Sequence, residues 1–236
     1  MHKVKVLTWN IRHALTDEGL VDIEAVIEEI LRHEVDVILL QEVDRVANRS
    51  GKVDQFLEIK KALGYDWHGI WTTRTRLGWT GLYGLATFTR YPIYTSNNHL
   101  LSDMHSEKCY AQECEIDVDG DPLSVINLHM PYDGHTGYIH TEMAWSTLND
   151  ISFPKDIIIG GDFNAYPISS EMQMVLSECV DVGESITSTS GRIDYCLGRG
   201  RAIPIDQRVI RTNISDHYPF VTTFLLKPFE GQVYKL

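Results

Sequence analysis

Residues 157–164 read IIIGGDFN, and the rest of the chain is interpreted outward from this stretch. Three β-branched apolar residues in a row are typical of a strand that is buried on both faces. The two glycines that follow allow a tight turn and the close approach of another group. Asp162 and Asn164 then lie at the carboxyl end of the strand, where ligands bind in α/β sheets. The stretch alone also fits a strand that ends in an ordinary turn, because Asp and Asn favour turns.

Apolar periodicity in the rest of the chain predicts an α/β fold. Before residue 157 it predicts a strand at 4–7, an amphipathic helix capped by Asp22, a strand at 35–40, a helix at 53–63 ended by Gly64, strands at 82–89, 93–101, 109–118 and 123–129, and a helix from about 137 to 151. After it come a helix capped by Ser169 and strands at 192–197, 203–210 and 218–226. Asp119-Gly120 predicts a hairpin turn. This order favours one domain over residues 1–236, with one mixed sheet or two sheets packed face to face and helices outside.

The composition limits what the chain can bind. A formal net charge of −12 does not favour a strong grip on duplex DNA, which is usually held by basic surfaces. No apolar run approaches the roughly 20 residues of a membrane-spanning helix. The N-terminus enters a strand pattern without the apolar region of a signal peptide, so we expect a cytoplasmic protein. The four cysteines lack metal-ligand spacing and are expected to be free thiols.

Polar residues of the metal-binding and acid–base types follow apolar strands at several places. They are Asn10, Glu42, Asn127 with His129, Asp162 with Asn164, and Asp216 with His217. Asp194 adds a carboxylate inside an apolar strand, which is costly unless the charge is paired, and His217 or a metal ion is a natural partner. Each residue alone has an ordinary explanation as a turn or surface residue. Together they predict one site where strand ends converge.

Six sequence blocks, taken in order, resemble the signature of a known superfamily. The blocks are TWNIR (8–12), QEV (41–43), NLH (127–129), GGDFN (160–164), IDY (193–195) and SDHYP (215–219). They resemble the endonuclease/exonuclease/phosphatase superfamily, which includes DNase I-like nucleases, abasic-site endonucleases, inositol polyphosphate 5-phosphatases and neutral sphingomyelinases. The resemblance spans nearly the whole chain. It implies a four-layer α/β sandwich of two packed mixed sheets flanked by helices, and a Mg²⁺-dependent phosphodiesterase or phosphomonoesterase.

The resemblance also implies a metal site. Glu42 is similar to the principal metal-binding carboxylate of the family, and Asn10 and Asp216 match positions that complete or border the site. The implied ion is Mg²⁺, with Mn²⁺ as a possible substitute. Oxygen ligands of this kind suit Mg²⁺, which keeps several waters and takes only one or two carboxylates.

The catalytic roles follow from the same resemblance. Asp162 matches the residue that positions or deprotonates the attacking water, and Asn164 matches the amide that holds a phosphate oxygen. His129 matches the histidine that gives a proton or a hydrogen bond to the phosphoryl group. His217 is similar to the second histidine of the family, and Asp194 to the carboxylate that orients it. In-line displacement needs an oriented water, neutralised phosphate charge and a stabilised leaving oxygen.

The chain departs from DNase I-like members behind the first histidine. In those relatives a glutamate from the preceding strand supports this histidine. Here no Asp or Glu occurs between Asp66 and Asp103, so the strand at 82–89 offers no carboxylate to His129. A literal DNase I assignment is therefore not favoured.

Substrate choice is expected to come from loops at the strand ends. The segment WTTRTRLGW (71–79) alternates arginine with hydroxyl residues, so Arg74, Arg76 and Trp79 are candidate substrate-binding residues together with Arg12. Arginine suits phosphate and tryptophan suits a base or sugar face. The alternative for residues 71–79 is a solvated hairpin loop. Residues 132–138 are a second candidate loop.

The sequence thus predicts a Mg²⁺-dependent phosphoesterase, either nuclease-like or specific for a small molecule or a lipid headgroup. The expected partner is a phosphate-ester substrate, which includes nucleic acid and phospholipid headgroups, and we expect a monomer. The alternative from another class is a non-catalytic phosphate-binding module that retains the fold.

Overall fold

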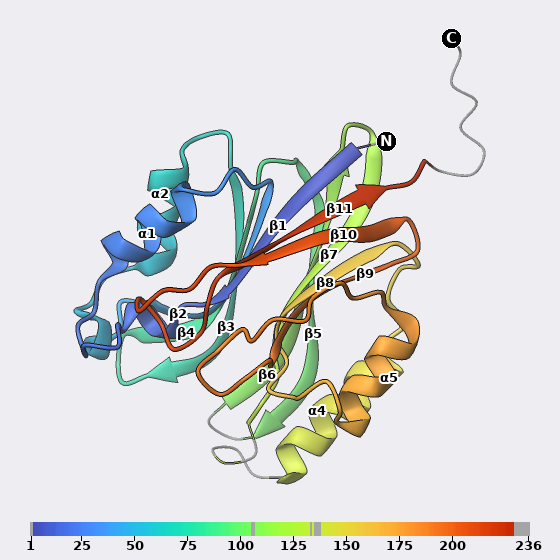
Figure 1. The fold of residues 1–236 in the computed structure, drawn as a ribbon. Helices are drawn as coiled ribbons and strands as arrows, with labels where there is room; N and C mark the ends of the chain where they lie inside the picture. Colours follow the sequence, from blue (N-terminus) through green and yellow to red (C-terminus); the bar gives the residue numbers. More distant parts are fainter. Residues whose placement is uncertain (1, 105–106, 133, 135–137, 229–236) are drawn as a thin grey trace.

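The computed structural model describes residues 2–104, 107–132, 134 and 138–228, which form two β-sheets with helices on their outer sides (Figure 1). The six-stranded sheet contains, in order, β10 (Ala202–Val209), β11 (Phe220–Leu226), β1 (His2–Asn10), β2 (Val37–Arg45), β4 (Gly81–Thr89) and β3 (His68–Leu77). The five-stranded sheet contains β5 (Ile93–Met104), β6 (Glu107–Val118), β7 (Asp121–His129), β8 (Ile157–Asp162) and β9 (Asp194–Arg199). The α-helices are α1 (Ile23–Leu31), α2 (Gln55–Leu63), α4 (Tyr138–Asp150) and α5 (Ser170–Glu178), and the short 3₁₀ turns are η1 (Arg12–Ala14) and η2 (Asn48–Ser50).

Three apolar cores stack these elements into four layers. Alternation along β1 shows how, because successive side chains of a strand point to opposite faces. Val4 and Val6 point into the core between the two sheets, whereas Leu7 and Trp9 pack in the core that also contains residues of α1 and α2. A third core lies on the outer side of the five-stranded sheet and includes residues of α4 and α5. The predicted order of helix, sheet, sheet, helix is therefore confirmed (Figure 1).

Each sheet has one parallel strand pair near its centre, and these pairs position the polar strand ends. In the six-stranded sheet, β1 runs parallel to β2, with Asn10 opposite Gln41. In the five-stranded sheet, β7 runs parallel to β8, with His129 opposite Asp162. The carboxyl ends of parallel strands meet at one edge of a sheet. Each sheet therefore carries two of the polar sequence blocks to a common edge.

Buried amides connect the two sheets just below this edge. The Gln41 side-chain nitrogen donates to Asn127 Oδ1 at 2.8 Å, and the Asn127 nitrogen donates to the carbonyl oxygens of Leu40 and Ala86. Gln41 and Asn127 are both fully buried. Buried amides are stabilising only when they are paired, so this network fixes how the sheets face each other. The sequence pattern grouped Asn127 with the candidate site residues. Its hydrogen bonds between the two sheets explain its burial at this position.

Most expected elements are present, with two corrections. The helix caps at Asp22 and Ser169, the helix end at Gly64 and the hairpin turn at Asp119-Gly120 are confirmed. Strand β2 does not end before Gln41 but continues through an irregularity to Arg45. Residues 71–77, expected to be part of a loop, lie in β3, because they pair along β4 and leave only the turn at 78–80 between the strands.

The remaining expectations concern cysteines and membranes. Cys109, Cys114, Cys179 and Cys196 are all free thiols, as expected. Among the residues described, no helix is long and apolar enough to cross a membrane.

Candidate active site

The centre of the site is the Asn10 amide, which lies between two carboxylates from different sheets. Its Nδ2 donates to Glu42 Oε1 at 3.2 Å and to Asp162 Oδ2 at 3.0 Å. Its Oδ1 accepts from the Arg12 backbone N–H at 3.0 Å. Because β1 and β8 supply residues to the same hydrogen-bonded group, strand ends from both sheets converge here as the sequence predicts.

Glu42 is aimed at this point by a local distortion of β2. The pairing of β2 with β4 shifts between Leu40 and Val43, and Glu42 has a φ of 55°. A bulge of this kind re-aims a side chain, and left-handed φ is unusual for a residue with a Cβ. Burial by itself would raise the pKa of Glu42, but the facing His13, His129 and the Asn10 amide lower the pKa to about 2. Glu42 is therefore an anion at any ordinary pH.

Asp162 is held on a regular strand end that depends on Gly161. A Cβ at Gly161 would lie 1.9 Å from the Leu128 carbonyl oxygen, and the residue has a φ of 140°, so only glycine fits. Asp162 Oδ1 accepts from the Asn164 N–H at 2.9 Å. The Asp162 side chain is 2% exposed. Burial, followed by the negative charge of Asp194, raises the pKa of Asp162, which makes it a stronger base than an ordinary aspartate.

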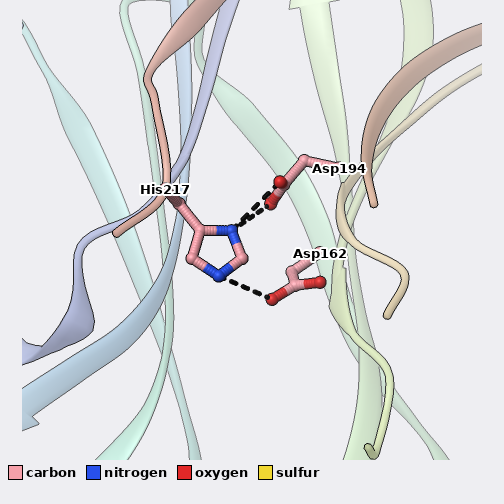
Figure 2. A group of neighbouring side chains, drawn as sticks. All are labelled: Asp162, Asp194 and His217. Carbon is pink, nitrogen blue, oxygen red and sulfur yellow. Dashed lines mark hydrogen bonds and ion pairs between the residues drawn. The ribbon is translucent and has the colours of Figure 1, made fainter. Parts of the chain in front are cut away.

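Figure 2 shows His217 between Asp162 and Asp194. Its Nδ1 lies 3.0 Å from both Asp194 oxygens, and its Nε2 lies 3.7 Å from Asp162 Oδ2. Burial alone would lower the pKa of His217, but the charges of Asp194 and Asp162 outweigh it and raise the pKa well above its ordinary value. His217 is therefore an imidazolium near neutral pH, and the predicted contact between Asp194 and His217 is confirmed.

His129 sits on the other side of Asp162 in a different electrostatic environment. Its Nε2 lies 3.5 Å from Asp162 Oδ2, whereas its Nδ1 is buried and has no hydrogen-bond partner among the described residues. Burial, followed by the charge of Arg74, lowers the pKa of His129 to about 3. The absence of a supporting carboxylate from β4, predicted from the sequence, agrees with this uncharged state. Of the two roles that the resemblance implies, His129 is suited to give a hydrogen bond rather than to start as an imidazolium acid.

Asp216 and Asn164 lie at the edges of the group. Asp216 Oδ2 is 3.5 Å from Arg12 Nε, and the Asp216 side chain is 34% exposed. The neighbouring Ser215 hydroxyl donates to the Asn10 carbonyl at 2.8 Å, which ties this segment to β1. Asn164 donates one N–H to the Met130 carbonyl at 2.8 Å. The second N–H of an amide can then serve another acceptor.

The candidate substrate-binding residues on the β3–β4 hairpin differ in exposure. Arg76 and Trp79 are exposed, and Trp79 is 100% exposed at the turn. Arg74 is 3% exposed, and its Nη2 lies 2.8 Å from Glu107 Oε1. The side chain of Arg74 points inward because residue 74 belongs to a strand rather than to a loop. In this arrangement the Arg74 guanidinium is engaged by the protein, and its charge acts on His129. The second candidate loop, at 132–138, lies mostly outside the described residues.

The donors around Glu42 fit a hard divalent cation. The ionised Glu42 carboxylate and the second lone pair of Asn10 Oδ1 are oxygen ligands of the kind that Mg²⁺ and Mn²⁺ take, and the Asp216 carboxylate beside Arg12 is a further oxygen ligand of this kind. Asp162, Asp194 and His217 form a second group, whose ligand atoms lie within 4.8 Å of one another. These three side chains lie close enough together to hold a metal ion, and the raised pKa of His217 favours acid–base chemistry for the group.

Several supporting residues were not predicted from the sequence. Thr187 Oγ1 donates to Asp194 Oδ2 at 2.8 Å and accepts from the Asp194 N–H, so it fixes the carboxylate. The Trp9 indole donates to the His217 carbonyl at 3.0 Å. His13 faces Glu42, with Nδ1 3.9 Å from Oε2. Thr187 lies outside the six blocks, and His13 follows one of them directly. His13 could have been found because it lies next to a sequence block, whereas nothing in the sequence marks Thr187.

Known proteins resemble the chain in fold more than in sequence. No curated protein matches the sequence. Among solved structures, the fold is similar to an endonuclease/exonuclease/phosphatase from Beutenbergia cavernae (TM-score 0.84, 20% identity, 96% of this chain and 72% of that chain). It is also similar to an endonuclease/exonuclease/phosphatase family protein from Leptotrichia buccalis (0.73, 19%, 94% and 99%). The human Nocturnin catalytic domain with a bound sulfate anion has a TM-score of 0.67 at 21% identity, covering 95% of each chain.

The family assignment rests on the sequence, because structural likeness at such identities shows the fold alone. The model of the Endonuclease/Exonuclease/phosphatase family matches residues 7–217. This range contains every residue of the group around Asn10. The chain therefore belongs to the endonuclease/exonuclease/phosphatase family, whose members are hydrolases of the phosphoesterase and nuclease type and generally depend on a divalent metal.

Proposed function

We propose that the chain is a divalent-metal-dependent phosphoesterase that hydrolyses a phosphodiester or phosphomonoester bond by in-line attack of water. The observation that carries this proposal is the row of contacts Glu42–Asn10–Asp162–His217–Asp194. The row joins a permanent anion, a carboxylate of raised pKa and an imidazolium within one site. Opposed pKa shifts at neighbouring groups are typical of acid–base sites.

Glu42 is the principal residue that would hold the cation, and Asn10 and Asp216 would complete the site. A bound divalent cation neutralises phosphate charge and acts as a Lewis acid on a phosphoryl oxygen. Mg²⁺ is the ion that the resemblance implies, and Mn²⁺ is a substitute of similar oxygen chemistry.

Asp162 and the two histidines would do the proton and hydrogen-bond work. Asp162 Oδ2 would orient the attacking water and accept its proton, a role that its raised pKa favours. His217, held as an imidazolium by Asp194, would place positive charge against the phosphoryl oxygens. His129 would contribute a neutral N–H, and Asn164 would offer its second amide N–H to a phosphate oxygen.

The substrate class follows from charge. The net charge of −12 disfavours an enzyme that covers a long duplex, since such binding uses many phosphate contacts. We therefore propose a small phosphoester, a nucleic acid gripped at few phosphates or a phospholipid headgroup. The alternative, a binding module without catalysis, has no support from the family match.

Turnover of bis-p-nitrophenyl phosphate tests the proposal. We expect hydrolysis with Mg²⁺ or Mn²⁺ that EDTA abolishes. Glu42→Gln should lose about 10³-fold or more, because Lewis-acid stabilisation is worth several kcal/mol. Glu58→Gln is the matched control, because Glu58 is an exposed carboxylate on α2 that pairs with Lys61. Full activity in EDTA, or a Glu42→Gln variant as active as the control, would overturn the proposal. Plasmid DNA, abasic-site DNA, RNA, phosphoinositides and sphingomyelin then separate the substrate classes.

A further inference from the structure

The turn after Asn10 has an unusual backbone that nothing in the proposed chemistry uses. Arg12, His13 and Ala14 all have left-handed φ, at 46°, 45° and 64°. A run of such values in residues with a Cβ is strained. Strain of this kind persists only where surrounding contacts over-determine it, and it concentrates at ligand sites. The strained turn therefore indicates a ligand-related role for His13, its central residue.

Gln55 holds the turn in place from the start of α2. This residue is fully buried. Its Nε2 donates to the His13 carbonyl at 2.7 Å, and its Oε1 accepts from the Asp44 N–H at 2.8 Å. Asp44 follows Glu42 by two residues on β2. One side chain thus fixes the backbone of His13 relative to the strand segment that carries Glu42.

The imidazole of His13 faces Glu42 across a gap. Its Nδ1 is buried, lies 3.9 Å from Glu42 Oε2 and has no hydrogen-bond partner in the part of the chain that the structure describes. A separation of 3.9 Å is too long for a hydrogen bond. It lies within the roughly 4.2 Å that two ligands of one cation can span at metal–ligand distances of roughly 2.1 Å each. A divalent cation between the two atoms would satisfy both.

We propose that His13 Nδ1 is a ligand of the divalent cation held by Glu42. The inference rests on the proposed function, because it adds a nitrogen ligand to the proposed cation site. Two distorted segments, the His13 turn and the Glu42 bulge, then serve one purpose, which is to bring a nitrogen and a carboxylate oxygen to one ion.

A nitrogen ligand changes which cation the site prefers. Mg²⁺ favours an all-oxygen set, whereas imidazole suits first-row transition metals, whose affinities for such sites rise along the series that begins at Mn²⁺. A site with one imidazole therefore gains affinity for Mn²⁺ relative to Mg²⁺. His13 would act as a specificity-determining residue for the metal.

Pulsed EPR of the Mn²⁺-loaded full chain tests the proposal without any activity assay. Directly bound imidazole gives a ¹⁴N coupling to Mn²⁺. Labelling the histidines with ¹⁵N should replace that ¹⁴N coupling by a ¹⁵N coupling. We expect the coupling in the wild type and its loss in both His13→Gln and His13→Asn. The matched control is His129→Gln, because His129 is another histidine near Glu42, and this variant should retain the coupling.

Calorimetric titration with Mn²⁺ and Mg²⁺ supplies a second measurement. His13→Gln should weaken Mn²⁺ binding about tenfold or more, while Mg²⁺ binding changes several-fold less. Mn²⁺ binding by the wild type without ¹⁴N coupling would overturn the role of His13 and leave the phosphoesterase proposal intact. A coupling that survives in His13→Gln but disappears in His217→Gln would place the nitrogen ligand elsewhere and also overturn it. Failure of the wild type to bind either ion would remove the cation site and the proposed function together.

Discussion

The two carboxylates on either side of Asn10 are held in opposite ways. Glu42 lies in a bulge with a φ of 55°, and its neighbours lower its pKa to about 2. Asp162 lies on a regular strand end, pairs in register with Asp194 and His129, and has a raised pKa. The Glu42 side of the site (Asn10, His13 and Glu42) thus fits the proposed cation site, whereas the Asp162 side (His129, Asp162, Asp194 and His217) fits the proposed proton transfer.

The contrast shows two ways of making a carboxylate functional. On the Glu42 side, backbone in sparsely populated conformations costs about 1–3 kcal/mol per residue, and buried contacts such as those of Gln55 offset it. On the Asp162 side the unusual backbone falls at Gly161 and Asn164, with φ of 140° and 48°, and the chemistry comes from burial and charge. Substitutions on the Glu42 side should change metal affinity and stability. Substitutions on the Asp162 side should change the pH profile of activity.

Removing the charge of Asp194 should strongly impair the Asp162 side of the site. Asp194→Asn should lower the rate by about 10²-fold or more, the scale of general acid–base catalysis. The Asp194 carboxylate raises the pKa of His217, so its loss lowers that pKa, and His217 gives up its proton at lower pH. The alkaline limb of the pH profile of kcat/KM should therefore move to lower pH.

The His217 pKa can be measured directly by NMR titration in both proteins. Thr187→Val is a graded control, because it removes one hydrogen bond to Asp194 Oδ2 but keeps the charge, and it should shift the His217 pKa much less. An identical His217 pKa in the wild type and Asp194→Asn would contradict the pairing as the source of the raised pKa.

The placement of the Asp162-side residues at one sheet edge could be predicted from sequence, for a physical reason. Polar residues after short apolar strands must lie at a sheet edge, and the edge of a parallel pair is a shared location, so Asp162, Asn164 and His129 were found from pattern alone. Asp194 was found because a carboxylate in an apolar strand requires a partner. The sandwich itself followed from the order of elements and the family resemblance.

The Glu42 side was less predictable because its geometry depends on backbone that the sequence does not mark. Left-handed φ is usually signalled by glycine, but Arg12, His13, Ala14 and Glu42 adopt it without one. A strand that continues past a bulge has the same residues as a strand that ends there, so the extension of β2 to Arg45 was missed. Arg74 was misplaced because alternating arginine and hydroxyl residues look the same in a loop and in a strand.

Loss of the Gln55 hydrogen bonds should perturb the Glu42 side of the site and not the Asp162 side. The expected effect is smaller than that of Asp194→Asn. Gln55→Met leaves the Asp44 N–H and the His13 carbonyl unpaired, which should lower the free energy of unfolding by about 2–4 kcal/mol. Metal affinity should fall with it, because His13 and Glu42 lose their common support. Thermal unfolding without metal and calorimetric titration with Mn²⁺ measure the two effects.

Gln112→Met is the matched control for Gln55→Met. Gln112 is also buried and also makes two side-chain hydrogen bonds, to Thr72 and Thr87. It should lose similar stability but keep its metal affinity. Equal losses of metal affinity in the two variants would mean that Gln55 acts only through general stability.

The smallest effects are expected at the β3–β4 hairpin, outside both sides of the site. Arg76 and Trp79 are exposed, so Arg76→Ala with Trp79→Ala should raise KM several-fold on the true substrate and leave kcat nearly unchanged, because such groups bind ground state and transition state alike.

Arg74→Ala should behave differently, because it removes a buried guanidinium paired with Glu107. It should lower the melting temperature and, by removing a positive charge near His129, raise the pKa of that histidine. Steady-state kinetics, thermal unfolding and NMR titration distinguish the two variants. An unchanged KM in the Arg76 and Trp79 double variant would identify the hairpin turn as solvated surface, and an unchanged His129 pKa in Arg74→Ala would show that Arg74 does not cause its neutrality.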